Sequence, residues 1–161
     1  MRDIALKSLA AALLLAPFAA NAAPLQPGEL SDPVAMAALK GAEMHAEAVG
    51  AHVCIAVLDN GGTLKAFHRM EGAAPGCVDS AIAKARAAAL YRIPTLTFMT
   101  RANAGEPALL ALPGMVPLGG GVPAKSAAGV WLGAVGAAGS TNPNEVQIAQ
   151  DGADAMVAAA K

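Results

Sequence analysis

The sequence predicts an α/β domain of the α+β type, in which helices flank a mostly antiparallel sheet of about five strands. Segments with apolar residues at every third or fourth position alternate with short runs rich in valine, isoleucine and leucine. Short turns join most of these runs, and short turns favour antiparallel pairing. The expected order is α-β-β-α-(α)-β-β-β-α, within a single domain over residues 31–161.

The composition is that of a small globular domain with small side chains. The chain has 161 residues, of which 42 are alanine, 55% are apolar and only 3% are aromatic. This apolar share rules out intrinsic disorder, and the net charge of −1 argues against a nucleic-acid partner. Because each buried alanine contributes little area, we expect burial to extend into the interface of a homo-oligomer.

The first 22 residues have the pattern of a secretory signal peptide. Arg2 and Lys7 precede an apolar run over residues 9–18, and small residues at Ala20 and Ala22 suit a signal peptidase. The run is shorter than the ~20 residues needed to span a bilayer. We therefore expect cleavage after Ala22, a leader over residues 23–30, no membrane span in the mature chain, and a periplasmic or secreted protein.

The first half of the domain is predicted as a helix followed by a β-hairpin. Asp32 and Pro33 begin a helix that ends near residue 49, before Gly50. Strands over residues 52–58 and 63–70 flank an Asp-Asn-Gly-Gly turn. The period of two places Val53, Ile55, Val57, Leu64, Ala66, His68 and Met70 on one face, and Cys54, Ala56, Lys65 and Phe67 on the other.

The second half contains two longer helices and three short strands. An alanine-rich helix over residues 77–92 ends before Pro94, and residues 95–112 predict a short helix within a loop. Asn142 and Glu145 form a predicted capping box at the start of the last helix, which continues to about residue 160. The expected strands cover residues 115–118, 122–125 and 130–137.

The cysteine spacing and the glycine run do not match the motifs of haem-attachment, zinc or phosphate-binding sites. Cys54 and Cys77 can form a disulfide in an oxidising compartment or remain two buried thiols, and the sequence leaves both open. No CxxCH haem-attachment motif and no zinc spacing is present. The glycines at residues 119–121 lack the other residues of a phosphate-binding loop, so they predict a tight turn.

Six short motifs follow one another over residues 55–64, 69–73, 84–88, 94–95, 119–123 and 133–139, and residues 148–149 add a match in the last helix. Together they resemble the GlcG/HbpS-like haem-binding and haem-degrading family, which is related to the C-terminal domain of PduO-type cobalamin adenosyltransferases. Glu71 and Ala87 depart from the aspartate and threonine that are usual in this family. The resemblance implies an antiparallel sheet of about five strands flanked by helices, oligomers from dimers to octamers and, for secreted members, haem binding.

Three histidines are candidate ligands for haem iron, which usually takes a His, Met, Cys or Tyr side chain. His45 is the first choice, because its helical neighbours are small residues that let a flat macrocycle approach. His68 comes next, since it shares a strand face with Met70, which is itself a candidate ligand, and Arg69 is a candidate partner for a haem propionate. His52 is interpreted as solvent-exposed. The resemblance adds Thr95 as a residue of the haem pocket.

Two other functions stay open. The protein could be an enzyme acting on a small organic acid, with Arg69 and Lys84 holding a carboxylate and His45 or Glu71 moving protons. It could also be a binding module without chemistry of its own. The export signal favours a haem protein for carriage, sensing or degradation over the enzyme.

Overall fold

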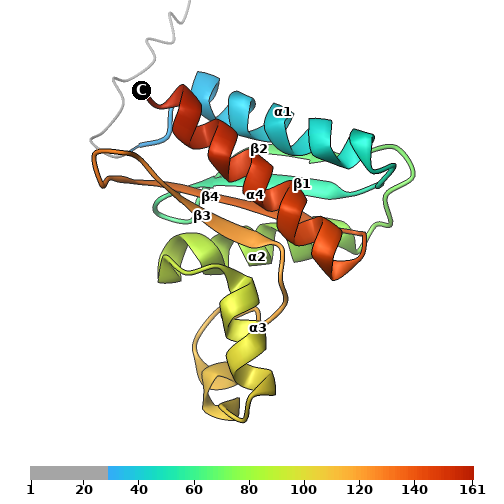
Figure 1. Ribbon diagram of the computed structural model, residues 1–161, viewed down its shortest axis with the longest axis vertical. Helices are drawn as coiled ribbons and strands as arrows, with labels where there is room; N and C mark the ends of the chain where they lie inside the picture. The colour runs from blue at the N-terminus through green and yellow to red at the C-terminus, as the bar shows by residue number, and fades with distance from the viewer. Residues whose placement is uncertain (1–28) are drawn as a thin grey trace, which may run out of the picture.

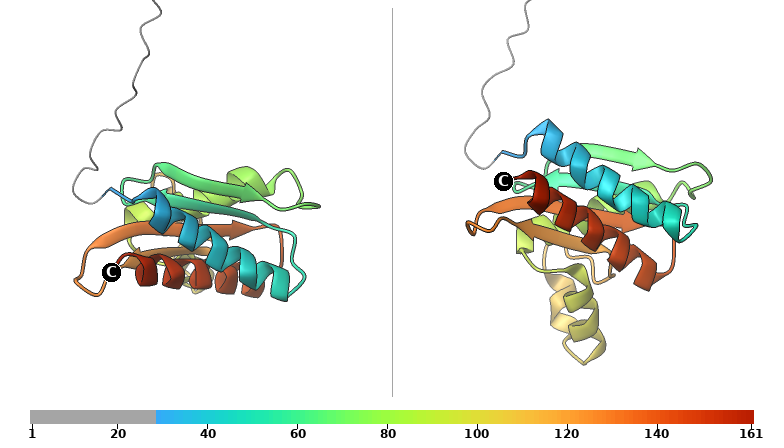
Figure 2. Two further views of the ribbon diagram at one scale, coloured as in Figure 1. Left: turned by 90° about the horizontal axis from the view of Figure 1, so that it is seen from above. Right: turned by 45° about the horizontal axis from the view of Figure 1, so that its top comes forward.

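A computed structural model describes residues 29–161; the expected signal peptide and most of the expected leader lie outside them. Two helices, α1 and α4, lie side by side on one face of a four-stranded antiparallel sheet, and α2 covers the other face (Figures 1 and 2). The strand order is β2-β1-β4-β3. The elements are α1 (Asp32–Ala48), β1 (Cys54–Asp59), β2 (Leu64–Arg69), α2 (Cys77–Tyr91), α3 (Thr95–Asn103), the short 3-10 helix η1 (Pro107–Ala111), β3 (Gly121–Lys125), β4 (Trp131–Ala138) and α4 (Asn142–Ala159).

The predicted α+β class and the antiparallel sheet are confirmed, with one strand fewer than expected. Residues 115–118 form no strand, and the chain there runs as a loop that leads to β3. Pro117 has no N–H to donate to a ladder, and it restricts the backbone of Val116 before it. α3 and η1 form a projection that points away from α2 and the sheet (Figure 1).

The two faces of β1 belong to different cores. Val53, Ile55 and Val57 pack with α1 and α4, whereas Cys54 and Ala56 pack with α2, as the period of two predicts. The prediction is wrong for Leu64 and Lys65, because a bulge breaks the register of β1 and β2 between Val57 and Leu58. Beyond this bulge, Leu64 pairs with Leu58 of the α2 face.

Small residues bring α1 and α4 close together. A Cβ added at Gly41 of α1 would lie 2.6 Å from the Cβ of Ala155 in α4. A Cβ at Gly152 of α4 would lie 3.0 Å from the carbonyl oxygen of Ala38. Leu30, the last residue of the expected leader, is buried in the same core. The abundance of alanine and glycine therefore serves close helix packing.

A disulfide joins Cys54 of β1 to Cys77 at the start of α2. Both residues are buried, and their Cα atoms are 5.4 Å apart. Of the two possibilities that the sequence left open, the structure has the bridge. None of the helices in residues 29–161 is long and apolar enough to cross a membrane.

Candidate functional site

His45 projects from α1 toward α4, where its Nδ1 lies 2.7 Å from Oδ2 of Asp151. A carboxylate only accepts hydrogen bonds, so Nδ1 carries the hydrogen and donates it. In the neutral imidazole the lone pair of His45 is then on Nε2, for which the structure describes no partner within residues 29–161. Such a nitrogen can bind a metal.

His45 lies among small residues where the two helices pack together. We call this region the α1–α4 seam and define it as Gly41, His45, Asp151 and Ala155. Gly41 is one helical turn before His45, and Asp151 is one turn before Ala155. The His45 side chain is 23% exposed, so solvent or a ligand can reach it. The small residues around His45 thus serve largely to bring α4 close to α1.

His68 lies on β2, at the edge of the sheet, and its Nδ1 is 2.5 Å from Oε1 of Glu43. It is 48% exposed, and Met70 packs on the same side against the core under α1. Glu43 lies on the flank of α1 that faces β2, whereas His45 lies on the flank that faces α4. The structure therefore does not bring His45 and His68 together, and they are alternative ligands.

Two other candidates lie elsewhere. Arg69 pairs with Cys54 on the α2 side of the sheet and donates from Nε to the carbonyl oxygen of Ala73. His52 is exposed, as the sequence analysis expects, and its Nδ1 donates to the carbonyl oxygen of Glu71 over 2.7 Å. The structure does not bring Arg69 near His45, because the sheet separates them.

Thr95 is buried at the start of α3. Its hydroxyl accepts from the N–H of Gly121 at 2.9 Å and donates to the carbonyl oxygen of the same residue at 3.4 Å. Both hydrogen-bonding roles are used, and the side chain has no exposed surface. Thr95 thus fastens α3 to β3 and presents no open atom to a ligand in this arrangement.

Next to Thr95, Lys84 and Glu145 form a buried ion pair. Lys84 Nζ lies 2.6 Å from Glu145 Oε2 and donates also to the carbonyl oxygen of Ala137. The glycine run covers the pair: a Cβ at Gly120 would lie 3.3 Å from Lys84 Nζ. We call this group the Lys84 cluster and define it as Lys84, Thr95, Gly120, Gly121 and Glu145.

The predicted capping box at Asn142 and Glu145 is wrong. The N-cap of α4 is Thr141, and Glu145 Oε1 instead accepts from the N–H groups of Gly139 and Ser140, at 2.7 and 3.1 Å. The spacing of the box is present, but a buried lysine attracts the carboxylate inward. An enzyme acting on a small organic acid would need Lys84 as an accessible cation to hold a carboxylate. Lys84 is instead buried and paired with Glu145.

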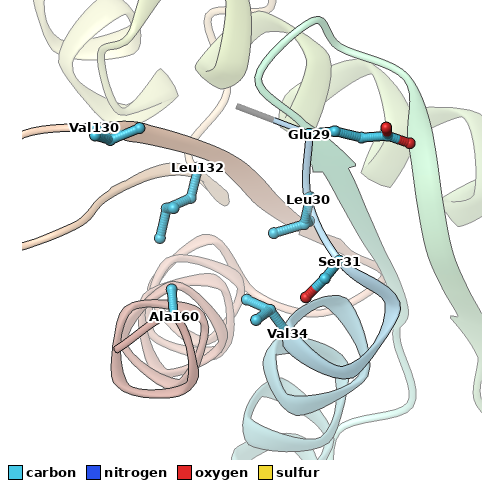
Figure 3. A pocket seen from close by; sticks show the side chains of 7 residues that line it. All are labelled: Glu29, Leu30, Ser31, Val34, Val130, Leu132 and Ala160. Atoms are coloured by element: carbon cyan, nitrogen blue, oxygen red, sulfur yellow. The ribbon is translucent and has the colours of Figure 1, made fainter. Parts of the chain in front are cut away.

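Two pockets lie at the far end of α4, away from the histidines. One has a volume of about 280 Å³, and the side chains of Leu30, Val34, Leu132 and Ala160 gather around it (Figure 3). The other, of about 290 Å³, lies beside it near Ala160. No predicted haem residue lines either pocket. Within residues 29–161, no group of three His, Cys, Asp or Glu side chains could hold a bare metal ion.

The model of the family described as haem degrading protein HbpS-like matches residues 30–154. The chain belongs to this HbpS-like family. The family resemblance inferred from the motifs is thereby confirmed.

Relatives of known sequence or structure agree with the family. GlcG of Escherichia coli K12 is 37% identical over 107 residues, which are 66% of this chain and 79% of GlcG. A double mutant of HbpS from Streptomyces reticuli is 35% identical, with a TM-score of 0.73 over 86% of this chain and 95% of HbpS. PduOC, solved in complex with heme, shares the fold at 23% identity, with a TM-score of 0.70 over 79% of this chain and 94% of PduOC.

Several residues of the site were not predicted from the sequence. Glu43 contacts His68, Asp151 contacts His45, and Gln147 contacts Asp151. No pattern in the sequence pointed to these three residues. The four-residue spacing of Gln147 and Asp151 indicates a contact along one helix face. It does not indicate that the carboxylate also reaches His45, which is 106 residues away.

Proposed function

We propose that this protein binds haem and that His45 would hold the haem iron. The observation that carries the proposal is the contact between His45 Nδ1 and Asp151. It fixes the tautomer and leaves Nε2 as the donor atom. Histidines that bind metals almost always donate their other N–H in this way. Membership in a family described as haem degrading supports haem as the bound group.

The donor set suits haem. A haem iron needs only one or two protein ligands, in contrast to a bare ion, and a single imidazole provides one. The bound haem would supply redox chemistry at the iron, while the chain supplies the ligand and part of the cover. His45 is preferred over His68 because His45 is the less exposed of the two, and burial of the macrocycle provides most of the binding energy.

We also propose that the protein works as an exported homo-oligomer. Helices α1 and α4 form the outer layer over one face of the sheet (Figure 2), and the four residues of the α1–α4 seam are each partly exposed, so one copy would cover only one side of a planar ligand. A second copy would cover the other side. Light scattering should show an oligomer at micromolar concentration, and the intact mass of periplasmic protein should lack residues 1–22. A monomer, or full-length cytoplasmic protein, would contradict this proposal.

The test of haem binding is titration of the purified protein with haemin, followed by absorption. The wild-type protein should give a Soret band shifted from that of free haemin. His45→Ala should remove or shift this band, whereas His52→Ala and His68→Ala should leave it in place. Loss of the band only in His68→Ala would move the ligand to β2, and the absence of a shifted band in the wild type would end the haem proposal. Loss of Soret absorbance on addition of peroxide would separate haem breakdown from carriage.

A further inference from the structure

We infer that Asp151 is a positioning residue for His45, held in place by Gln147, and that it favours the ferric state of the bound haem. The inference rests on the proposed function. Beyond haem binding itself, α4 would orient the ligand residue His45 and favour one oxidation state of the iron.

The geometry forms a chain of three side chains. Gln147 Nε2 donates to Asp151 Oδ1 at 2.7 Å, and His45 Nδ1 donates to Asp151 Oδ2 at 2.7 Å. Each carboxylate oxygen therefore has its own donor, and the plane of the carboxylate is fixed from two sides. Gln147 and Asp151 belong to α4, so the imidazole on α1 is oriented by the opposite helix.

The packing of the helices keeps this chain in register. Gly41 lies against Asp151 and Ala155, and an added Cβ at Gly41 would lie 3.1 Å from the carbonyl oxygen of Asp151. Because His45 is one turn beyond Gly41, its distance from Asp151 is set next to a close contact of the two helices. Supporting contacts of this kind hold a ligand group in a narrow range of positions.

The chemistry follows from the hydrogen bond. A carboxylate that accepts from Nδ1–H withdraws part of the proton's charge and leaves more electron density on Nε2. A stronger donor stabilises Fe³⁺ more than Fe²⁺, so the reduction potential of the bound haem falls. Loss of such a partner typically weakens metal affinity about 10–100-fold.

The chain contains a matched control. Gln150 Nε2 donates to Asp154 Oδ1 at 2.9 Å, which is the same pairing four residues apart on the same helix. Asp154 is exposed, and no contact with a histidine is described for it. Asp154→Asn therefore removes the same charge from α4 without touching His45.

The experiment compares wild type, Asp151→Ala, Asp151→Asn and Asp154→Asn. In the haem-free protein, ¹⁵N NMR should show His45 with the hydrogen on Nδ1 in wild type and Asp154→Asn, and a mixture of tautomers in Asp151→Ala. In the haemin complex, Asp151→Ala should bind about 10–100-fold more weakly and have a higher reduction potential. Asp151→Asn, which keeps an acceptor without the charge, should fall between. Circular dichroism reports whether each variant folds.

Two results separate the inference from the function. If haemin binds through His45 but Asp151→Ala changes neither affinity nor potential, the role of Asp151 is overturned and haem binding stands. If wild-type protein binds no haemin, or binds it through another residue, the proposed function fails and the role of Asp151 toward haem fails with it. The NMR spectra still decide whether Asp151 sets the tautomer. A His45 that carries its hydrogen on Nε2 in the wild type would overturn the positioning role directly.

Discussion

The α1–α4 seam and the Lys84 cluster both join segments that are far apart in the sequence, and they use their polar groups in opposite ways. In the Lys84 cluster, Glu145 and Thr95 each use every polar atom within the protein, and Lys84 is 3% exposed. In the seam, Asp151 holds one nitrogen of His45 and leaves the other without a described partner. The first region is built for stability and the second has an atom available for a ligand.

The family motifs and the proposed ligand site lie in different parts of the sequence. The family motifs around residues 84, 95, 119–121 and 133–139 meet at the Lys84 cluster and at the close contact of α2 with the sheet. His45 and Asp151 lie in none of the six motifs. The motifs therefore identify the fold, whereas the proposed ligand belongs to features outside them.

Lys84→Met should lower the free energy of unfolding by about 3–5 kcal/mol, since it leaves Glu145 charged and buried without its partner. Urea denaturation followed by circular dichroism measures the change. Lys40→Met, at an exposed cation of α1, serves as the control and should change little. A decrease in the free energy of unfolding below about 1 kcal/mol for Lys84→Met is what an exposed ion pair gives. That result would contradict the stabilising role of the Lys84 cluster.

Replacement of Cys54 and Cys77 by alanine should lower stability by about 3 kcal/mol, because the bridge closes a loop between residues separated by 23 positions. The unfolding transition of the double variant should be the same with and without reductant, whereas reductant should lower the stability of the wild type. Haemin affinity of the folded variant should remain, since the bridge lies on the α2 side of the sheet. A large loss of affinity would show that the two faces are coupled.

Gly136→Ala should lower stability by about 1–3 kcal/mol through overpacking. A Cβ at this position would lie 2.2 Å from the carbonyl oxygen of Ala81 in α2, so the helix must move away from the sheet. Gly76→Ala is the control, because nothing lies within 4 Å of its added Cβ. Equal melting temperatures for the two variants would contradict the close approach.

The smallest effect is expected on the projection. The hydrogen bond from Arg101 lowers the pKa of Glu106, so their pairing favours the folded state at neutral pH. This contribution is lost as the pH falls through the lowered pKa of Glu106. Arg101→Ala should return that pKa to its ordinary range in an NMR titration and leave the rest of the spectrum unchanged. An unaltered pKa would show that the pair does not persist in solution.

Much of the fold could be predicted because the responsible signals are local. The ends of α1 and α2 follow from Pro33, Gly50 and Pro94, and the alternation in β1 follows from its own residues. Two local signals failed for reasons that are not local. The bulge at Val57 and Leu58 changes the face of Leu64, and the buried Lys84 draws Glu145 away from the capping role.

The candidate site was harder to predict than the fold. His45 was recognisable because its neighbours on the helix are small, and those neighbours are fixed by helical spacing. Its partner Asp151 was not recognisable, because the contact depends on how α4 packs across α1. For the same reason, the engagement of the Thr95 hydroxyl by Gly121 could not be predicted from the sequence.

One haemin titration of two variants, one from the α1–α4 seam and one from the Lys84 cluster, decides between the two regions as the haem site. His45→Ala should lose or shift the Soret band at a protein concentration where the wild type is saturated. Thr95→Val should keep the wild-type band, although it leaves a buried N–H of Gly121 unpaired and should cost about 1–3 kcal/mol of stability. A wild-type band in His45→Ala together with its loss in folded Thr95→Val would contradict the account and move the haem site to the Lys84 cluster.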